Sequence, residues 1–315
     1  MTGTSLGMFS IVVLIWLFSL IVVGAIGYGA GALIGGLQRA GLVVACAGWT
    51  ASGVLALLRP VEAVLARLLF RGLRRPGPAE LARIAPALDR VCRTAGDDPG
   101  RYLLRVQDNR QVNAFALGGH VLAVTRVALD LPDDMLEAVL AHELGHHRQL
   151  HPAAIILGWW YLLPFEAAER LLRGIRRTTR AMARAFSRLS DRTGGVAGGR
   201  AADGALGMLL VLAALGVLVV VGAVLVVVLG LLWLPLALVV RVARVLGAAL
   251  SRAGEFAADR HAAELGYGPG LVRVLELFVT GERSAPRPRG MAALLRSHPT
   301  GQARIQAILR TPPAV

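Results

Sequence analysis

Long runs without a charged side chain dominate the hydropathy pattern of this sequence. Four such runs occupy residues 1–38, 40–58, 152–165 and 204–240. Because about 20 apolar residues in a helix cross a bilayer core, the pattern predicts a mainly α-helical integral membrane protein. We expect transmembrane helices within roughly residues 8–30 and 41–58, the first retained as a signal anchor because it lacks a basic start and a polar stop.

Residues 78–151 have instead the mixed composition of an ordinary globular segment. Apolar periodicity and turn residues predict a helix, two strand-forming stretches and a second helix, at residues 79–95, 102–106, 113–125 and about 132–150. The longer strand-forming stretch is interrupted at Gly118-Gly119. In the second helix we expect Asp130 as the N-cap and Pro132 in the first turn. These elements therefore predict a soluble part with an α+β fold, in which helices pack on a small sheet.

Composition and charge agree with a membrane protein. The chain is 55 % hydrophobic with a mean hydropathy of +0.60, and its net charge of +14 comes from arginine, because lysine is absent. Six arginines but only two glutamates occur in residues 59–83, and such an excess marks the cytoplasmic side of a membrane. The arginines lie beside hydrophobic runs without interleaved aromatic residues, which argues against a nucleic-acid partner and for a lipid surface.

Residues 166–203 carry nine arginines and four acidic residues. At helical spacing most of the arginines fall on one side, which predicts a basic amphipathic helix lying on anionic headgroups or packed in solvent on the soluble part. Two topologies remain open. In the first, residues 152–165 and 207–240 each cross the membrane once. In the second, residues 152–165 lie at the membrane interface and 207–240 folds into a tight hairpin. Residues 194–204 are expected to form a flexible link.

The most specific motif is His142-Glu143-Leu144-Gly145-His146, within the helix expected at about 132–150. Residues four apart share a helix face, so His142 and His146 can place two imidazole nitrogens on one metal ion. Glu143 follows the first ligand and can take a proton from a water that zinc activates. The motif therefore predicts one Zn²⁺ per chain with Glu143 as general base.

A zinc site of this kind needs a third protein ligand. Glu255 and Asp259 form a carboxylate pair at i, i+4 in the segment that follows the last hydrophobic run. In that arrangement Glu255 would bind the metal, and Asp259 could accept the free ring N–H of a ligand histidine. His147 and His151, just beyond the motif, are interpreted as surface or supporting groups. His120 and His261 carry no readable signal.

Taken together, these features resemble the HtpX-type membrane metallopeptidases, relatives of the CAAX prenyl proteases. The resemblance extends from the hydrophobic hairpin through Asn113 to Gly119 and the His142 motif, and then through Arg252 with Glu255-Phe256 and Ala258-Asp259 to His298-Pro299 with Arg304. It implies a gluzincin-like α+β domain with zinc ligands His142, His146 and Glu255 and with Glu143 as general base. Around the ligands, Asp259 and Arg252 are expected to support the site.

The resemblance also implies a substrate-binding edge strand, along which an extended peptide would pair. Its residues are Asn113, Ala114, Phe115, Ala116, Leu117 and Gly118. His298 is expected to approach the metal, where it would either stabilise the oxyanion or block the site as an extra ligand. The sequence alone does not separate these two roles of His298.

The organisation expected from the sequence has four parts. A transmembrane hairpin at 1–60 is followed by two parts of the peptidase domain, 61–151 and 241–315, separated by a membrane-associated region at 152–240. We predict a membrane-bound zinc endopeptidase of the cell membrane, multi-pass, with its site at the cytoplasmic face and a membrane-associated protein or peptide as substrate. A metallopeptidase-like sensor or scaffold is the alternative. A transporter is disfavoured, since the hydrophobic runs lack ionisable residues.

Overall fold

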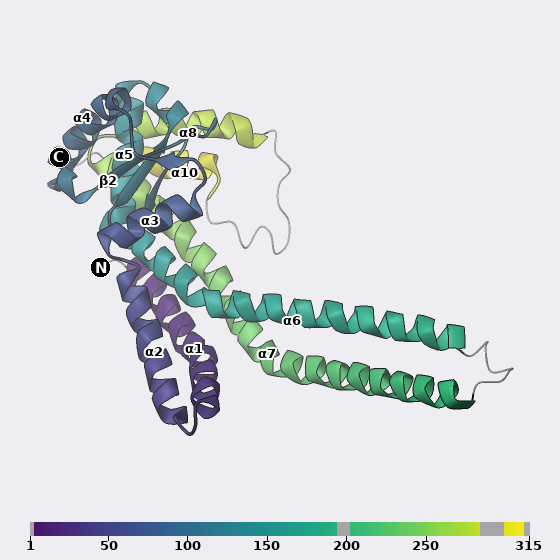
Figure 1. The fold of residues 1–315 in the computed structure, drawn as a ribbon. Helices are drawn as coiled ribbons and strands as arrows, with labels where there is room; N and C mark the ends of the chain where they lie inside the picture. The colour runs from purple at the N-terminus through teal and green to yellow at the C-terminus, as the bar shows by residue number, and fades with distance from the viewer. Residues whose placement is uncertain (1–2, 194–201, 284–298, 312–315) are drawn as a thin grey trace. The chain divides into compact units, whose positions relative to one another are not determined.

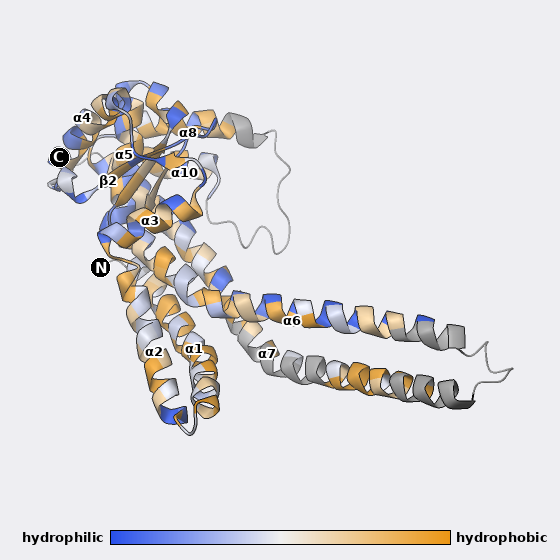
Figure 2. Cartoon of the chain, viewed as in Figure 1, coloured by the Kyte–Doolittle hydropathy of each residue, from blue (hydrophilic) through white to orange (hydrophobic). Residues whose placement is uncertain are grey.

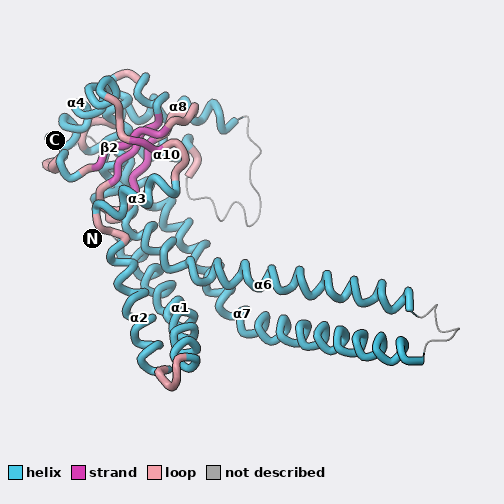
Figure 3. Tube along the Cα trace, in the orientation of Figure 1, coloured by secondary structure: helices cyan, strands magenta, loops and turns pink. Residues whose placement is uncertain are grey.

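The computed structural model describes residues 3–193, 202–283 and 299–311. The chain divides into two units, Met1–Tyr161 with Val242–Val315, and Leu162–Arg241. Each unit is mostly helical, and the first also contains a small mixed sheet (Figures 1 and 3). This agrees with the mainly α-helical fold with a small sheet that the sequence predicts.

The helices expected from the first two hydrophobic runs are present as α1 (Gly3–Leu33) and α2 (Gln38–Leu55). They lie side by side (Figure 1), with the backbone of Gly41 so close to Gly27 that a side chain on either would overlap the other helix. Small residues permit this approach between membrane helices. After an 86° bend, α3 (Arg59–Leu69) leads toward the sheet.

Among the described residues, Ser5–Leu33 is long and apolar enough to cross a membrane, and α2 passes the same test when joined with α3. A shorter apolar helical stretch covers Leu212–Val224. In Figure 2, most residues of α1 and α2 have hydrophobic or intermediate colours. Exposed side chains such as Ile21, Ile26 and Val44 are consistent with a lipid environment for this hairpin.

The sheet has four strands, β1 (Leu73–Arg74), β2 (Leu103–Gln107), β3 (Ala114–Leu117) and β4 (Val121–Thr125). Their order is β1-β2-β4-β3, with β2 and β4 parallel and the other pairs antiparallel. The strand stretches expected on either side of Gly118-Gly119 are therefore β3 and β4. Because β3 pairs with β4 alone among the described strands, it lies at an edge of the sheet.

The sheet separates two apolar cores, as the alternation of side chains along a strand requires. Leu122 and Val124 of β4 face a core built with α4 (Pro78–Ala95), α5 (Asp133–Arg148), α8 (Gly268–Arg283) and α10 (Gly301–Leu309). Val121 and Ala123 face a smaller core with Ala66 of α3 and Ile156 of α6 (His151–Thr193). The short helices η1 (Pro99–Arg101) and η2 (Arg126–Asp130) precede β2 and α5.

One sequence-based expectation differs from the structure, and another falls partly outside the described residues. The N-cap of α5 is Pro132, whereas Asp130 ends η2, because the chain forms a separate 3₁₀ turn before the helix. Residues 194–201 of the link expected at 194–204 lie outside the described residues. Its last residues, 202–204, already belong to α7 (Ala202–Glu264).

The tight-hairpin topology for 207–240 is wrong, because α7 continues unbroken through the whole run. The run has no Pro-Gly, Asn-Gly or Gly-Gly pair that would favour reversal of the chain. The run 152–165 and the arginine-rich segment likewise form one helix, α6, which continues through Pro164.

Candidate metal centre

Helix α5 carries both histidines of the motif on one face. It is a central helix of the larger core, with Leu136, Leu140 and Leu144 fully buried on its other side. His142 is 7 % exposed and Glu143 is 6 % exposed, so the site lies at the core rather than on an open helix surface. Apolar burial thus fixes the rotation of α5, and with it the direction of both imidazoles.

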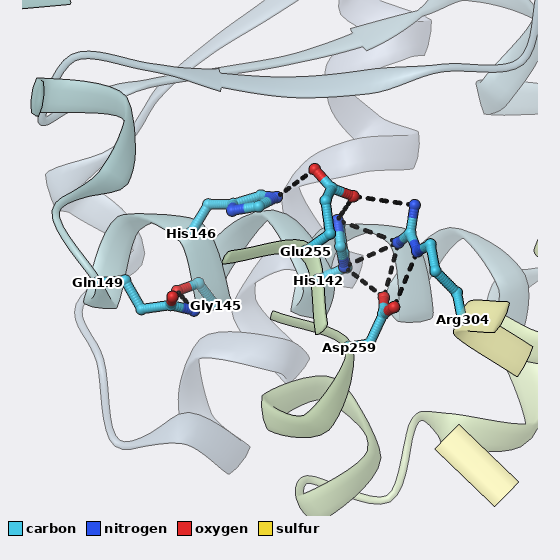
Figure 4. Close-up of polar contacts among 7 residues, drawn as sticks. All are labelled: His142, Gly145, His146, Gln149, Glu255, Asp259 and Arg304. Atoms are coloured by element: carbon cyan, nitrogen blue, oxygen red, sulfur yellow. Dashed lines mark hydrogen bonds and ion pairs between the residues drawn. The ribbon is translucent and has the colours of Figure 1, made fainter. Parts of the chain in front are cut away.

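Helix α7 brings Glu255 to the two histidines (Figure 4). Gly145 permits this, because a side chain at this position would collide with the backbone of Ala258. Glu255 Oε2 lies 3.6 Å from His142 Nε2, and Glu255 Oε1 lies 3.4 Å from His146 Nε2. Two ligands of a tetrahedral zinc at 2.0–2.1 Å are separated by about 3.3 Å. The buried nitrogen and oxygen donors therefore fit zinc in kind and in spacing.

Asp259 and Arg304 complete the polar cluster around the three candidate ligands. Asp259, fully buried one turn after Glu255, has Oδ1 2.9 Å from Nδ1 of His142. A ring N–H donated to this carboxylate leaves Nε2 of His142 with its lone pair toward Glu255. Arg304 of α10 donates to Asp259 at 2.6 and 2.8 Å, and its Nη1 lies 2.9 Å from Glu255 Oε2 (Figure 4).

The charges of this cluster stabilise one another. Burial by itself would raise the pKa of the Asp259 carboxyl, but hydrogen bonds from Arg304 and His142 lower it below its ordinary value. Burial by itself would lower the pKa of Arg304, and the hydrogen bond to Asp259 raises it above its ordinary value. Asp259 is therefore a carboxylate and Arg304 a guanidinium cation at neutral pH.

His147 and His151 are buried, at 3 % and 5 % exposure, so of the two expected roles, surface or supporting group, the surface role is wrong. Nε2 of His147 lies 3.2 Å from the carbonyl oxygen of Val121 and donates to it, which joins α5 to the sheet. Burial lowers the pKa of His147 to about 4, so its ring is neutral at pH 7. The ring of His151 lies 5.4 Å from that of His146 and packs against Gly254.

The other residues that the sequence singled out lie in three places. The candidate substrate strand from Asn113 to Gly118 contains β3, which packs beside α5. Arg252 is partly buried on α7, one turn before Glu255. His298 lies outside the described residues, and Pro299 is the first described residue after it.

Two polar residues with prominent contacts were not assigned roles from the sequence. Arg304 is one of 34 arginines, but it lies on the same helix face as the buried Gly301, Ile305 and Ile308. That periodicity could have identified it as a buried cation. The second residue, Glu62, is fully buried on α3 and contacts His120; a lone glutamate followed by arginines gives no comparable signal.

Comparison with protein families identifies the family of this chain. The profile described as peptidase family M48 matches residues 78–311, which include α5, the end of α7 and α10. No curated protein matches the chain. The matched segment is more than half of the sequence and contains every residue of the candidate metal centre. The chain therefore belongs to peptidase family M48.

Proposed function

We propose that this chain is a membrane-bound zinc endopeptidase of the HtpX type. It would cleave peptide bonds in membrane or misfolded proteins as part of protein quality control. Membership of a metallopeptidase family supports the class of reaction. The observation that carries the zinc assignment is the buried cluster of His142, His146 and Glu255, whose donor atoms lie within 4.8 Å of one another.

In this proposal His142, His146 and Glu255 hold one Zn²⁺. Bound zinc would supply a Lewis acid that polarises the substrate carbonyl and makes water acidic enough to lose a proton near neutral pH. Asp259 fixes the tautomer of His142 by accepting the Nδ1 proton, and Arg304 holds both carboxylates of α7 in place. The chain's contribution is thus a preorganised set of ligands in a buried position.

Glu143 is the proposed general base. Its carboxylate is nearly buried, and it follows His142 on α5. It would accept a proton from the attacking water and later transfer that proton to the leaving amine nitrogen. His298 remains the proposed oxyanion-stabilising or blocking residue, and Arg252 a proposed supporting residue of Glu255.

Substrate binding is proposed at the edge strand. β3 has its pairing partner β4 on one side, and it packs beside α5, which carries both histidines. An extended peptide that added to β3 from Asn113 to Gly118 would run past the metal centre by backbone pairing. This mode selects an extended chain rather than one particular side chain, in keeping with unfolded segments as substrates.

The hairpin of α1 and α2 supports a membrane location, and the arginines after α2 support a cytoplasmic site. We propose a multi-pass protein of the cell membrane on these grounds. We propose that α6 and α7 each cross once, because this arrangement gives an even number of crossings between His146 and Glu255 without a hairpin in 207–240. Mapping the accessibility of a cysteine placed at Arg180 would test this topology.

The decisive experiment compares the purified full chain with Glu143→Gln and with Asp134→Asn, a matched carboxylate-to-amide change on the same helix. We expect zinc in all three proteins, casein cleavage by the wild type and Asp134→Asn, and none by Glu143→Gln. Cleavage by Glu143→Gln at the wild-type rate would remove this residue from the mechanism. Zinc-loaded wild type without cleavage of casein or membrane substrates would favour the sensor or scaffold alternative.

A further inference from the structure

A buried carboxylate away from the metal centre holds the turn between β3 and β4. Glu62, in the first turn of α3, is fully buried. Its Oε1 accepts the backbone N–H of Gly119 at 2.6 Å, and its Oε2 accepts that of His120 at 3.0 Å. Nδ1 of His120 lies 3.0 Å from the same Oε2. Three donors from one turn thus converge on a single side chain.

The turn is shaped around this carboxylate. Gly118 has φ +60, in the left-handed region that favours glycine. A Cβ on Gly118 would in addition overlap the carboxylate of Glu62. The turn and the side chain therefore fit together closely, and neither can move far without losing the backbone hydrogen bonds.

Stability alone does not account for a glutamate at this position. The surrounding core is apolar, with Leu117, Val121 and Ile156 among its members. Burial of a carboxylate is costly even with hydrogen bonds, and apolar replacements of buried charges are often neutral or stabilising. The carboxylate instead fixes the position of the turn, because its two oxygens hold the backbone N–H groups of Gly119 and His120 at defined points.

The fixed turn lies at one end of the candidate substrate strand. β3 has only four residues, ending at Leu117 immediately before Gly118. Its other end is held by Asn113, whose N–H donates to Thr125 Oγ1 at 3.0 Å and whose carbonyl accepts the Thr125 N–H at 2.9 Å. A short edge strand held by one neighbour thus depends on anchors at both ends, and Glu62 is the anchor supplied by α3.

We propose that Glu62 is a positioning residue for substrate binding, which fixes the register of β3 and connects it to the N-terminal hairpin through α3. This inference rests on the proposed function, because it takes β3 as the strand with which substrate pairs. Glu62 does not touch the metal ligands. Its loss is therefore expected to weaken substrate binding and to leave the chemical step and the metal unaffected.

The test uses the full chain with fluorescein-labelled casein as the probe. Affinity is measured by anisotropy in a Glu143→Gln background, so that binding is observed whether or not the protein cleaves. We expect Glu62→Gln to weaken binding about tenfold, the loss expected for hydrogen bonds to a charged group. His120→Ala, which removes only the ring contact, should weaken binding by about threefold.

Turnover is measured in protein that keeps Glu143, and it distinguishes a positioning role of Glu62 from a general loss of structure. Glu62→Gln should raise KM with kcat and zinc content unchanged. Glu80→Gln is the matched control, because Glu80 also accepts a backbone N–H, that of Gly77 at 2.7 Å, but lies away from β3. It should leave KM unchanged.

Unchanged affinity in both Glu62→Gln and His120→Ala would overturn the inference. So would a loss of zinc and kcat with KM unchanged. If Glu62→Gln does not fold, the partly exposed His120→Ala decides the matter. Absence of cleavage by the wild type with intact casein binding would refute the proposed function and leave the positioning role of Glu62 testable by affinity.

Discussion

Oδ1 of Asp259 lies 2.9 Å from Nδ1 of His142, so a residue of α7 fixes the imidazole of a residue of α5. Removing the negative charge while keeping the shape should loosen this ligand. We expect Asp259→Asn to lower zinc affinity by about 10- to 100-fold, the usual effect of losing such a partner. Competition with a chromophoric chelator measures this affinity.

Asp134→Asn, on the exposed start of α5, provides the matched control for this prediction. It should bind zinc as the wild type does. Equal zinc affinity in Asp259→Asn and the wild type would show that the Asp259 contact does not orient the ligand.

Arg304 balances two buried carboxylates, Glu255 and Asp259. We expect Arg304→Met to destabilise the metal-free protein by about 3–5 kcal/mol, because it leaves buried charge without its partner. Arg304→Lys should be intermediate, since an ammonium keeps the charge but lacks the planar pair of donors. Thermal unfolding in detergent after chelation compares these variants.

The exposed pair of Arg273 and Asp134 provides the contrast. Arg273→Met should change stability by only about 0–1 kcal/mol. If Arg304→Met were no less stable than Arg273→Met, the buried cluster would not depend on the arginine charge.

The sequence predicted the local parts of this molecule well. Residues four apart place His142 and His146 on one face of any helix, and the proline and acidic residues at its start predicted the helix itself. The strands either side of Gly118-Gly119 followed from the same kind of local pattern. Hydropathy alone likewise predicted α1 and α2.

Contacts between distant segments were harder to predict. Arg304 reaches Asp259 only because α10 packs on α8, and α8 on α5. The burial of Glu62 beneath Gly119 depends on the path of α3 across one face of the sheet. The continuity of α7 stayed undecided from the sequence, because the length of the charge-free run fits one long helix and two short ones equally well.

Glu80 provides a pH-dependent contribution to stability. The hydrogen bond from Arg74 lowers the pKa of Glu80 from its ordinary value of 4.5 to about 2. A carboxyl with a lowered folded-state pKa stabilises fully above about pH 4.5, and this stabilisation is lost as the pH falls to about 2. Because the pair is partly exposed, its contribution should be on the order of 1 kcal/mol.

The comparison is between the wild type and Glu80→Gln, each unfolded by denaturant across this pH range. The wild type should be more stable near neutral pH, and the difference should disappear toward pH 2. A difference that stayed constant with pH would mean that the charge of Glu80 contributes nothing.

Gly145 sets the distance between the two helices that carry the ligands. A Cβ at this position would lie 2.9 Å from Cα of Ala258, where backbone leaves no room to adjust. We therefore expect Gly145→Ala to push α7 away from α5, moving Glu255 from His142 and His146. Alanine favours helix more than glycine does by about 1 kcal/mol, so local helix propensity opposes any loss of stability and cannot explain weaker zinc binding.

Zinc titration of Gly145→Ala should show an affinity reduced by at least about tenfold, because ligands displaced by a fraction of an ångström no longer share one ion. The control is Gly174→Ala, since a Cβ there meets nothing within 4 Å on α6. Wild-type zinc affinity in Gly145→Ala would mean that α7 can shift along α5 without separating the ligands. The position of Glu255 would then depend on Arg304 and not on the close contact of the helices.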